Sequence, residues 1–444
     1  RASMLPLSPP TPGAHGMARL REEYHLPKQP ALPEMAQQDP EYPPPVWPHA
    51  VPPSALFADW MSSTPSHPLS SLDLLEWSDL VDDTFLFDRI TPAIAESVVR
   101  FVLTGKRLTK AGLEHVFAID RLQFSHLATL VIVDCPAVDD RILQLIGRSI
   151  SQIELSPSRR MSKRASHNPV RSKKGARFHS ITLDTLPKIG DDGLRAIAMQ
   201  HGKHLREWRI RRCPRITSLS IKGLADMGPD DGRLTTLELE ECPEAQQNLG
   251  DGLSVFLDRC EVGELILRRF ASLAESVVFN EHSRLQGMKK FAVYVTDFTR
   301  MHIARLVQAR KVQCAPSQQA HNAPLNATTP SQPVLTALSL VGGGSKTKTL
   351  QSSLTDPDLA PLHESYHTTG QDETRRPTRS LFCRSLLHLD LSHNRKLTDE
   401  GVAQVIKKTG KLRTLNVSHT GITATNTLVA AVSINDWLKE IKAV

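Results

Sequence analysis

The stretch "LREWRIRRCP" at residues 205–214 returns 29 residues later as "LTTLELEECP" at residues 234–243. Residues 127–136, "LATLVIVDCP", carry the same form, L-x-x-L-x-L-x-x-C-P. The segments "LLHLDLSHN" at 386–394 and "LRTLNVSHT" at 412–420 keep its first part. Self-similarity at such a period indicates stacked copies of one supersecondary unit.

Looser copies of the pattern begin at seven further positions along the chain. They are Val98, Ile150, Phe178, Val262, Met288, Leu335 and Leu438. Since leucine positions alternate with other residues, each copy has the period of a β-strand with one buried face. The sequence therefore predicts twelve strands.

A second phrase lies between the predicted strands, as "KIGDDGLRAIAMQHGKHL" at 188–205 and "KLTDEGVAQVIKKTGKL" at 396–412. Its apolar residues fall at the i, i+3, i+4 spacing of one helical face. These residues are Leu194, Ile197 and Ala198 in the first phrase and Val402, Val405 and Ile406 in the second. Asp191 and Asp399, or their neighbours, stand where a helix N-cap is expected.

A short strand followed by a helix cannot bury its apolar face alone, but stacked copies can. The expected fold class is α/β: a solenoid with a parallel concave sheet and helices on the convex side. These motifs resemble the leucine-rich repeat superfamily. The Cys-Pro after the strand and the helix phrase resemble its cysteine-containing subtype, known from F-box and related adaptor proteins. The resemblance covers roughly residues 98–444.

The strand at residues 207–211 is rich in arginine. Because strand side chains alternate, Arg209 and Arg211 are expected on the concave face. Glu238 and Glu240 hold the equivalent positions of the next strand. Opposite charges on neighbouring strands pair, which favours a neutralised ladder. A contact of the two arginines with a protein partner or nucleic acid remains the alternative.

The rest of the predicted concave face is mixed in character and is not a positive stripe. It comprises Val131, Val133, Thr182, Asp184, Ile266, Arg268, Ala292, Tyr294, Asp390, Ser392, Asn416 and Ser418. Cys135, Cys213 and Cys242 stand at the turn after a strand, and we expect them to be small buried residues. Six cysteines in 444 residues form no disulfide framework, and no zinc-ligand spacing occurs.

The net charge of +7 is concentrated in residues 156–177, which contain eight Lys/Arg and no Asp/Glu. Without this segment, the remaining 422 residues have a net charge of −1. Flexible basic side chains can contact RNA phosphates, although a solvated loop is the alternative. The candidate RNA-binding residues are Arg159, Arg160, Lys163, Arg164, Arg171, Lys173, Lys174 and Arg177.

The motifs of enzymes are not found in the sequence. It has no nucleophile elbow, HExxH or GxGxxG, and "SLVGGGSKT" at 339–347 lacks the glycine spacing of a phosphate-binding loop. No catalytic residue, metal, cofactor or small-molecule substrate is expected. No apolar run is long enough to cross a bilayer.

The sequence divides into three parts. These are an extended Pro-rich tail at 1–71, an N-terminal cap at 72–97 and a repeat solenoid at 98–444 with insertions at 156–177, 312–334 and 342–384. The 72–95 region is also where an adaptor would have its F-box, but the Leu-Pro opening of that motif is missing. Residues 1–75 hold 16 of the 31 prolines, which favours an extended conformation.

The tail segment "DPEYPPPVWPHAV" at 39–51 resembles the acidic-Tyr-Pro-x-Trp motif of a protein family of the mitochondrial large ribosomal subunit. The matching residues are Asp39, Glu41, Tyr42, Pro43 and Trp47. Aromatic side chains are typical anchors for a ribbon that docks on a partner, although a Pro-rich linker is the alternative. The predicted protein-binding residues of the tail are Tyr42, Trp47, Phe57 and Trp60.

The chain begins with Arg1 and has no acidic residue before Glu22, as expected for the mature form of a protein imported into the mitochondrial matrix. The leading hypothesis is a structural or assembly subunit of a mitochondrial ribonucleoprotein, with the ribosome as the first candidate, in contact with proteins and ribosomal RNA. One alternative is an F-box-like substrate adaptor. Another is a peripheral subunit or assembly factor of a respiratory complex or ATP synthase.

Overall fold

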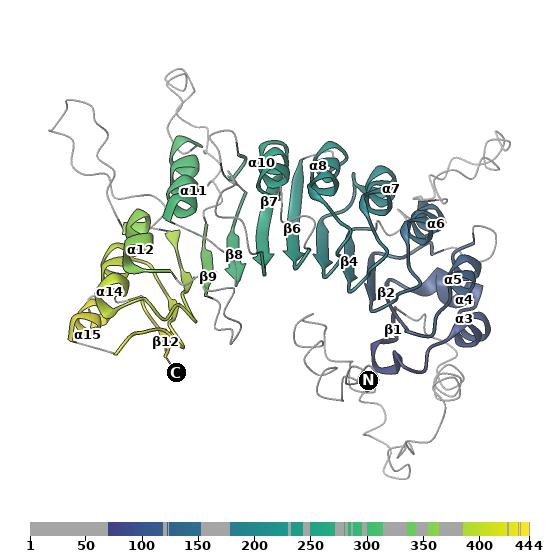
Figure 1. Ribbon diagram of the computed structural model, residues 1–444, viewed down its shortest axis with the longest axis horizontal. Helices are drawn as coiled ribbons and strands as arrows, with labels where there is room; N and C mark the ends of the chain where they lie inside the picture. The colour runs from purple at the N-terminus through teal and green to yellow at the C-terminus, as the bar shows by residue number, and fades with distance from the viewer. Residues whose placement is uncertain are drawn as a thin grey trace, which may run out of the picture.

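A computed structural model shows the architecture of the chain. It describes residues 70–118, 122, 124–151, 178–229, 232–242, 249–270, 279, 283–285, 287–294, 300–313, 335–342, 354–363, 385–423, 426–433, 435 and 437–443. Within these residues the chain forms one open sheet of twelve parallel strands, ordered β1 to β12 as in the sequence. Figure 1 shows the coils following one another in an arc from the N-terminal to the C-terminal end. This confirms the predicted α/β leucine-rich repeat solenoid.

The strands are short, and most are separated by a helix. They are β1 (Ser71–Asp73), β2 (Arg100–Thr104), β3 (Thr129–Val133), β4 (Ser180–Asp184), β5 (Glu207–Arg211), β6 (Arg233–Glu240), β7 (Glu261–Arg268), β8 (Lys290–Tyr294), β9 (Ala337–Val341), β10 (His388–Asp390), β11 (Thr414–Asn416) and β12 (Glu440–Lys442). The described residues between β7 and β8 belong to neither a helix nor a strand.

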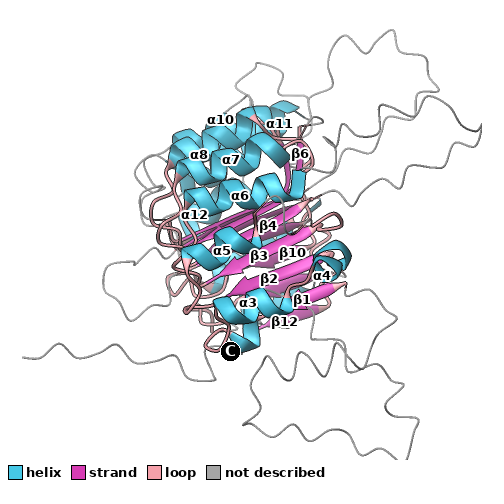
Figure 2. Ribbon diagram, turned by 90° about the vertical axis from the view of Figure 1, so that its right-hand side faces the viewer, coloured by secondary structure: helices cyan, strands magenta, loops and turns pink. Residues whose placement is uncertain are grey.

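The helices belong to the segments that connect the strands. Figure 2 shows α5 to α8 on one side of the sheet. The elements are the 3-10 helix η2 (Leu75–Trp77) and the α-helices α3 (Asp83–Arg89), α4 (Pro92–Ser97), α5 (Lys110–Val116), α6 (Asp140–Ser151), α7 (Asp191–His201), α8 (Ser218–Asp226), α10 (Leu249–Arg259), α11 (Arg300–Gln313), α12 (Asp356–His363), α14 (Asp399–Lys408) and α15 (Asn426–Ser433). The opposite side of the sheet is the concave face.

The register aligns one apolar residue of every coil into a row that faces the helices. This row runs Leu72, Phe101, Leu130, Ile181, Trp208, Leu237, Leu265, Phe291, Leu338, Leu389, Leu415 and Ile441. All but Ile441 are at most 3% exposed and belong to one continuous core. At about 0.8 kcal/mol per buried methylene, the row contributes to stability in every coil but the last.

One of the predicted strands is wrong. Ile150 belongs to α6, because it continues the helical spacing of Ile142 and Ile146 on the buried face of that helix. The structure has a different strand in its place. This strand is β1, which lies in the segment expected to be a cap. A single apolar residue in a short window fits the period of a strand as well as that of a helix. At Ile150 the structure has the helix.

The segment 342–384 was expected to be an insertion without a helix, and this is also wrong in part. Residues 356–363 form α12, which packs between α11 and α14 and completes a coil of the solenoid. The prediction failed because Pro361 stands inside the helix and the apolar spacing is weak. The other residues of 343–384, up to 353 and from 364, lie outside the described residues, as do 314–334 of the second predicted insertion.

The N-terminal coil closes its end of the core. Helices α3 and α4 are capped by Asp82 and Thr91, whose side chains accept hydrogen bonds from Phe85 N and Ile94 N. Phe85 and Ile94 are each 5% exposed, so the two helices cover the apolar surface of this coil. The expected tail, residues 1–71, lies outside the described residues as far as residue 69.

Each of the sharp turns after seven strands is built around a non-glycine residue in the left-handed conformation. These residues are Asp134, Thr185, Arg212, Glu241, Arg269, His393 and His419, with φ between 47° and 62°. In this conformation the N–H of Arg212 donates to Glu240 O of the next strand at 2.8 Å, and that of His393 donates to Ser418 O at 2.9 Å. The bond to the next coil offsets the local backbone strain.

Asp191 and Asp399 occupy the first helical position, and the N-caps are their neighbours Gly190 and Thr398. The Asp191 carboxylate accepts hydrogen bonds from the next coil, from Thr217 N at 2.9 Å and Thr217 Oγ1 at 2.6 Å. Asp399 accepts the same pair of bonds from Thr423, and Asp83 and Asp356 do so from Thr109 and Thr398. These aspartates therefore join consecutive coils, a role that explains their recurrence without catalysis.

Candidate binding surface on the concave face

The middle of the concave face carries a group of charged residues on β4 to β7 and the turns that follow. We call it the arginine–carboxylate cluster. Its members are Asp184, Glu207, Glu238, Glu240, Glu241, Arg209, Arg211, Arg212, Arg268 and Arg269. Five arginines balance five carboxylates, so the formal net charge of the cluster is zero.

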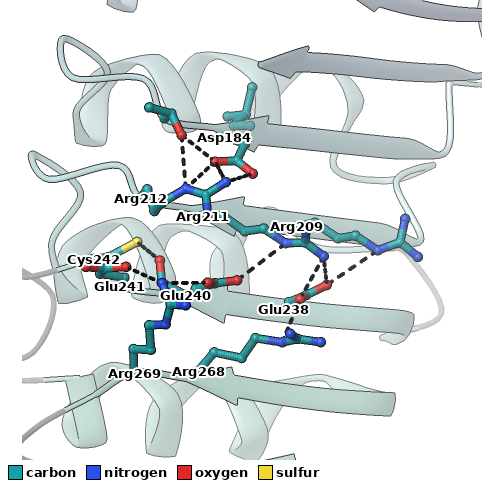
Figure 3. Close-up of polar contacts among 12 residues, drawn as sticks. Asp184, Arg209, Arg211, Arg212, Glu238, Glu240, Glu241, Cys242, Arg268 and Arg269 are labelled. Atoms are coloured by element: carbon teal, nitrogen blue, oxygen red, sulfur yellow. Dashed lines mark hydrogen bonds and ion pairs between the residues drawn. The ribbon is translucent and has the colours of Figure 1, made fainter. Parts of the chain in front are cut away.

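Glu238 is the centre of this cluster, as Figure 3 shows. Both of its carboxylate oxygens accept hydrogen bonds from Arg211 Nη2 at 2.9 Å. Arg268 Nε lies 3.2 Å and Arg209 Nε 3.7 Å from the same carboxylate. The side chains of Arg211 and Glu238 are each 3% exposed. In a buried ion pair of this kind, removal of either side chain leaves the charge of the other buried without compensation.

The turn residues extend the cluster on both sides of β5. Arg212 holds Asp184 by two hydrogen bonds, from Nε at 2.9 Å and Nη2 at 2.6 Å. Burial raises the pKa of the Asp184 carboxyl above its usual value, while the Arg212 guanidinium opposes this shift. On the other side Arg269 pairs with Glu241 at 2.9 Å and with Glu240 at 3.6 Å.

The pairing of the strand arginines with Glu238 and Glu240 confirms the neutralised ladder. Arg211 has its guanidinium inside the cluster and is not exposed to a partner. Arg209 is 32% exposed, so it remains a candidate for protein binding at the margin of the cluster. Arg268, also at the margin, lies over the ring of Tyr294, with 4.6 Å from Cζ to the ring centroid.

Four residues of the cluster were not singled out from the sequence: Glu207, Arg212, Glu241 and Arg269. Glu207 is the first residue of β5. Each of the other three directly follows the last residue of a strand, where alternation no longer determines the direction of the side chain. The signal that could have found them is their recurrence at one position of the repeat, immediately before Cys213, Cys242 and Phe270. That position is left-handed in all three coils.

The C-terminal part of the concave face is more open to solvent. Its half-exposed residues, which we call the C-terminal concave surface, are Ser339, Val341, Asp390, Asn416 and Ser418. The carboxylate of Asp390 accepts a hydrogen bond from Ser392 N at 3.0 Å, and the side-chain Oδ1 of Asn416 accepts one from Ser418 N at 3.2 Å. Each side chain retains further capacity for hydrogen bonds to a bound chain.

Two histidines border this surface on the following turns. The rings of His393 and His419 stack with their centroids 4.6 Å apart and an interplanar angle of 28°. Burial and the neighbouring His419 lower the pKa of His393 below its ordinary value of 6.5. This part of the surface therefore consists of small polar groups, one carboxylate and a histidine pair.

The cysteines of the repeat turns are buried and free, as predicted. The Cys213 thiol donates to Arg211 O at 3.2 Å and the Cys242 thiol to Glu240 O at 3.4 Å. Burial raises the pKa of Cys135 and Cys213 above the ordinary thiol value, and that of Cys242 to about 12. These thiols are thus protonated at neutral pH and unsuited to nucleophilic chemistry.

All of the other predicted site residues lie outside the described residues. They are the RNA-binding candidates Arg159, Arg160, Lys163, Arg164, Arg171, Lys173, Lys174 and Arg177 and the tail aromatics Tyr42, Trp47, Phe57 and Trp60. The part of the chain that the structure describes contains no group of three or more His, Cys, Asp or Glu arranged to hold a metal ion. No helix in that part is both long and apolar enough to span a membrane.

Comparison with known proteins supports the repeat architecture. A family model described as "Leucine Rich repeat" matches residues 382–404, which include β10 and the start of α14. No curated protein matches the sequence. The coils of the structure and this match together support a leucine-rich repeat architecture.

A solved structure of the Rad7–Elc1 complex of yeast contains a similar chain. The similarity covers 83% of this chain and 73% of that chain, with 16% sequence identity and a TM-score of 0.39.

Proposed function

We propose that this protein is a non-enzymatic scaffold that binds an extended segment of a partner protein on the C-terminal concave surface. The observation that carries the proposal is the contrast between concave positions. In the central coils Arg211, Glu238 and Glu240 are at most 3% exposed and are occupied with one another. Across β9 to β11 the positions equivalent to Glu238 are held by Ser339, Asp390 and Asn416, which stay half-exposed and keep hydrogen-bonding capacity.

The chemistry of this surface suits a peptide-like ligand. Hydroxyl and amide groups bind the N–H and C=O groups of an extended backbone, and Asp390 binds a basic or hydroxyl side chain. Val341 contributes an apolar contact. Since hot spots are enriched in aromatic and arginine side chains, Tyr294 and Arg268 at the adjoining edge provide the anchor of this surface.

Site-specific photo-cross-linking tests this proposal. A photoreactive amino acid is placed at Asn416 on the concave face or, as a matched control, at Lys408 on the exposed face of α14. Protein adducts are expected at position 416 and not at 408, and Asp390→Arg should reduce their yield about tenfold by reversing a charge that the partner contacts. Lys407→Glu is the charge-reversal control on the convex side. Equal adducts at both positions would contradict the proposal.

A second role, RNA binding by residues 156–177, is favoured by the eight Lys/Arg concentrated there without an acidic residue. In the sequence this segment stands between α6 and β4, and it lies outside the described residues. Replacing all eight basic residues by Gln should abolish RNA affinity and its dependence on salt, measured by fluorescence anisotropy with a labelled single-stranded RNA. Replacing Lys407, Lys408 and Lys411 serves as a control for nonspecific charge.

The cellular setting is a proposal that rests on sequence features. The basic segment and the aromatic tail favour a subunit of a mitochondrial ribonucleoprotein. The cysteine-containing repeats favour an F-box-like adaptor, with residues 71–97 forming the first coil of the solenoid. Sedimentation of an organelle lysate with and without ribonuclease separates these settings: co-migration lost on ribonuclease treatment favours the ribonucleoprotein. Capture of a ubiquitin-ligase scaffold favours the adaptor.

A further inference from the structure

The concave face of the N-terminal coils is apolar and buried, unlike the polar surface of the C-terminal coils. Val102 of β2 lies on this face beside Val131 of β3, and Val133 follows on the same side of β3. The exposed fractions of these valines are 0%, 3% and 2%, and they are those of the single chain. With Leu75 of η2 they form a hydrophobic cluster separate from the main core, which we call the valine patch.

Burial this complete on the open face of a sheet requires a covering segment. A side chain on a solvated face is flanked by its neighbours on the adjoining strands but keeps its outer end in water. Leu75 is the one member of the valine patch that lies outside the strands. It lies beside β2, because Leu74 N donates to Val102 O at 3.1 Å. One leucine side chain is too small to cover three valines on two strands, so β3 needs a further cover.

Thr104 provides a second, independent observation. It is two residues after Val102 on the same face of β2 and is 1% exposed. Its Oγ1 atom has no hydrogen-bond partner in the part of the chain that the structure describes. A buried hydroxyl without a partner is unfavourable, and a backbone carbonyl of an extended segment would satisfy it. Segments rich in proline offer such carbonyl groups, since they form no hydrogen-bonded ladder of their own.

The segment that precedes β1 has the composition expected of this cover. Residues 51–69, "VPPSALFADWMSSTPSHPL", include four prolines, one aspartate and no glutamate, lysine or arginine. Its large apolar residues Leu56, Phe57, Trp60 and Met61 stand close together in the sequence. A patch of valines with one free hydroxyl suits a segment of this kind, because apolar surface is removed from water on both sides.

The valine patch is within reach of this segment. Ser70 O accepts hydrogen bonds from Val99 N at 2.9 Å and Arg100 N at 3.0 Å, so the segment ends at the start of β2. The ten residues from Trp60 to Ser70 span at most about 33 Å, whereas β1 and β3 are about 10 Å apart. The chain between Ser70 and Trp60 is therefore long enough to cross both strands.

We propose that residues 51–64 dock in extended form on the valine patch of the same chain. Phe57 and Trp60 cover the valines of β3, and a carbonyl group of the segment accepts the hydrogen bond of Thr104 Oγ1. The chain itself thereby closes the N-terminal part of its concave face and leaves the C-terminal concave surface for other molecules. This docking does not depend on the binding of a partner there.

Photo-cross-linking in the full chain tests the docking. The photoreactive p-benzoylphenylalanine replaces Phe57 or, as a matched control in the same tail, Tyr24. Tryptic peptides 101–106 and 122–141 carry the valines of the patch. Adducts of these peptides within one chain are expected from position 57, with a yield about tenfold above that from position 24. Equal yields from both positions, or adducts that join two chains, would overturn the proposal.

A charge placed in the valine patch sharpens this test. Val131→Asp puts a carboxylate under the docked segment and should lower the cross-linking yield from position 57 about tenfold. Val341→Asp is the matched control, since Val341 is half-exposed on the concave face of β9, and it should leave the yield unchanged. Far-UV circular dichroism confirms that both variants are folded. An unchanged yield in folded Val131→Asp would contradict docking at this patch.

Oxidative footprinting of the unmodified chain needs no variant. Hydroxyl radicals oxidise accessible tryptophan and methionine side chains. If the segment is docked about nine-tenths of the time, Trp60 and Met61 should react about tenfold more slowly than Trp47 and Met35 of the same tail. Similar oxidation rates for all four side chains would overturn the proposal even if Val131→Asp does not fold.

Discussion

The central and the C-terminal coils use the same repeat positions in different ways. On β5 and β6 two concave positions of each strand hold long charged side chains: Arg209, Arg211, Glu238 and Glu240. All of these but Arg209 are buried against one another. On β10 and β11 the equivalent positions hold Asp390 and Asn416, which are short and half-exposed. This comparison shows that a charged stripe on a repeat surface is not in itself a binding site. Long charged side chains can reach and pair with one another, whereas short side chains leave their hydrogen-bonding groups accessible to a partner.

The largest effect is expected from breaking the central cluster. Glu238→Ala leaves Arg211 buried without its carboxylate and should lower the free energy of unfolding by about 3–5 kcal/mol. Denaturant unfolding measures this change. Glu264→Ala is the matched control on β7, because Glu264 is 42% exposed and pairs loosely with Lys290 at 3.9 Å. The control should cost less than about 1 kcal/mol. Similar losses of unfolding free energy for the two variants would mean that burial does not increase the contribution of the cluster to stability.

A smaller effect is expected from separating two coils on the helix side. Asp191→Ala removes the acceptor for Thr217 N and Thr217 Oγ1 and should cost about 1–2 kcal/mol of unfolding free energy. The control is Asp192→Ala at the next position of α7, where the side chain is exposed. Thermal unfolding of both variants distinguishes a bond between coils from a general effect of charge near the helix start. Equal shifts would indicate the latter.

The histidine pair at the C-terminal coils should give a weak dependence of stability on pH. The pKa of His393 is lowered in the folded chain, so the unfolded chain takes up the proton more readily. The contribution is fully present above pH 6.5 and is lost as the pH falls below that value toward the lower folded pKa. Histidine Cε1 chemical shifts followed by NMR report this pKa, and His419→Gln should raise it. Titration of His393 at or above 6.5 in the native chain would contradict the expectation.

The smallest effect on stability is expected on the C-terminal concave surface. Asp390→Asn keeps the acceptor for Ser392 N and should change the unfolding free energy by less than about 0.5 kcal/mol. If this surface binds a partner, the same change should nevertheless lower the cross-linking yield from position 416. A stability loss as large as that of Glu238→Ala would remove the distinction between the two regions.

The register of the solenoid could be predicted from the sequence because leucine positions recur with the strand period. Arg209, Arg211, Glu238 and Glu240 were placed on the correct face by alternation alone. Alternation could not show that Arg211 binds Glu238, since Glu240 is its direct neighbour in register. A long guanidinium reaches diagonally, and its choice of partner depends on how Arg268 and Arg269 fill the remaining space.

The missed elements have a different cause. The left-handed turns are formed by Asp, Thr, Arg, Glu and His, and none of these residue types signals such a turn as glycine does. The bond to the following coil, formed by residues far along the chain, stabilises them. Likewise α12 forms between α11 and α14 despite Pro361, because packing on both sides outweighs local propensity.

The left-handed turns also bear on how the nascent chain folds. The N–H of Asp134 donates to Asp184 O and that of Arg212 donates to Glu240 O, and six of the seven left-handed turns are bonded in this way to a coil synthesised later. The link from Asp191 to Thr217 runs in the same direction. During translation each coil is therefore expected to become rigid only after the next coil has been synthesised. Rigidity should thus spread along the protein one coil behind synthesis.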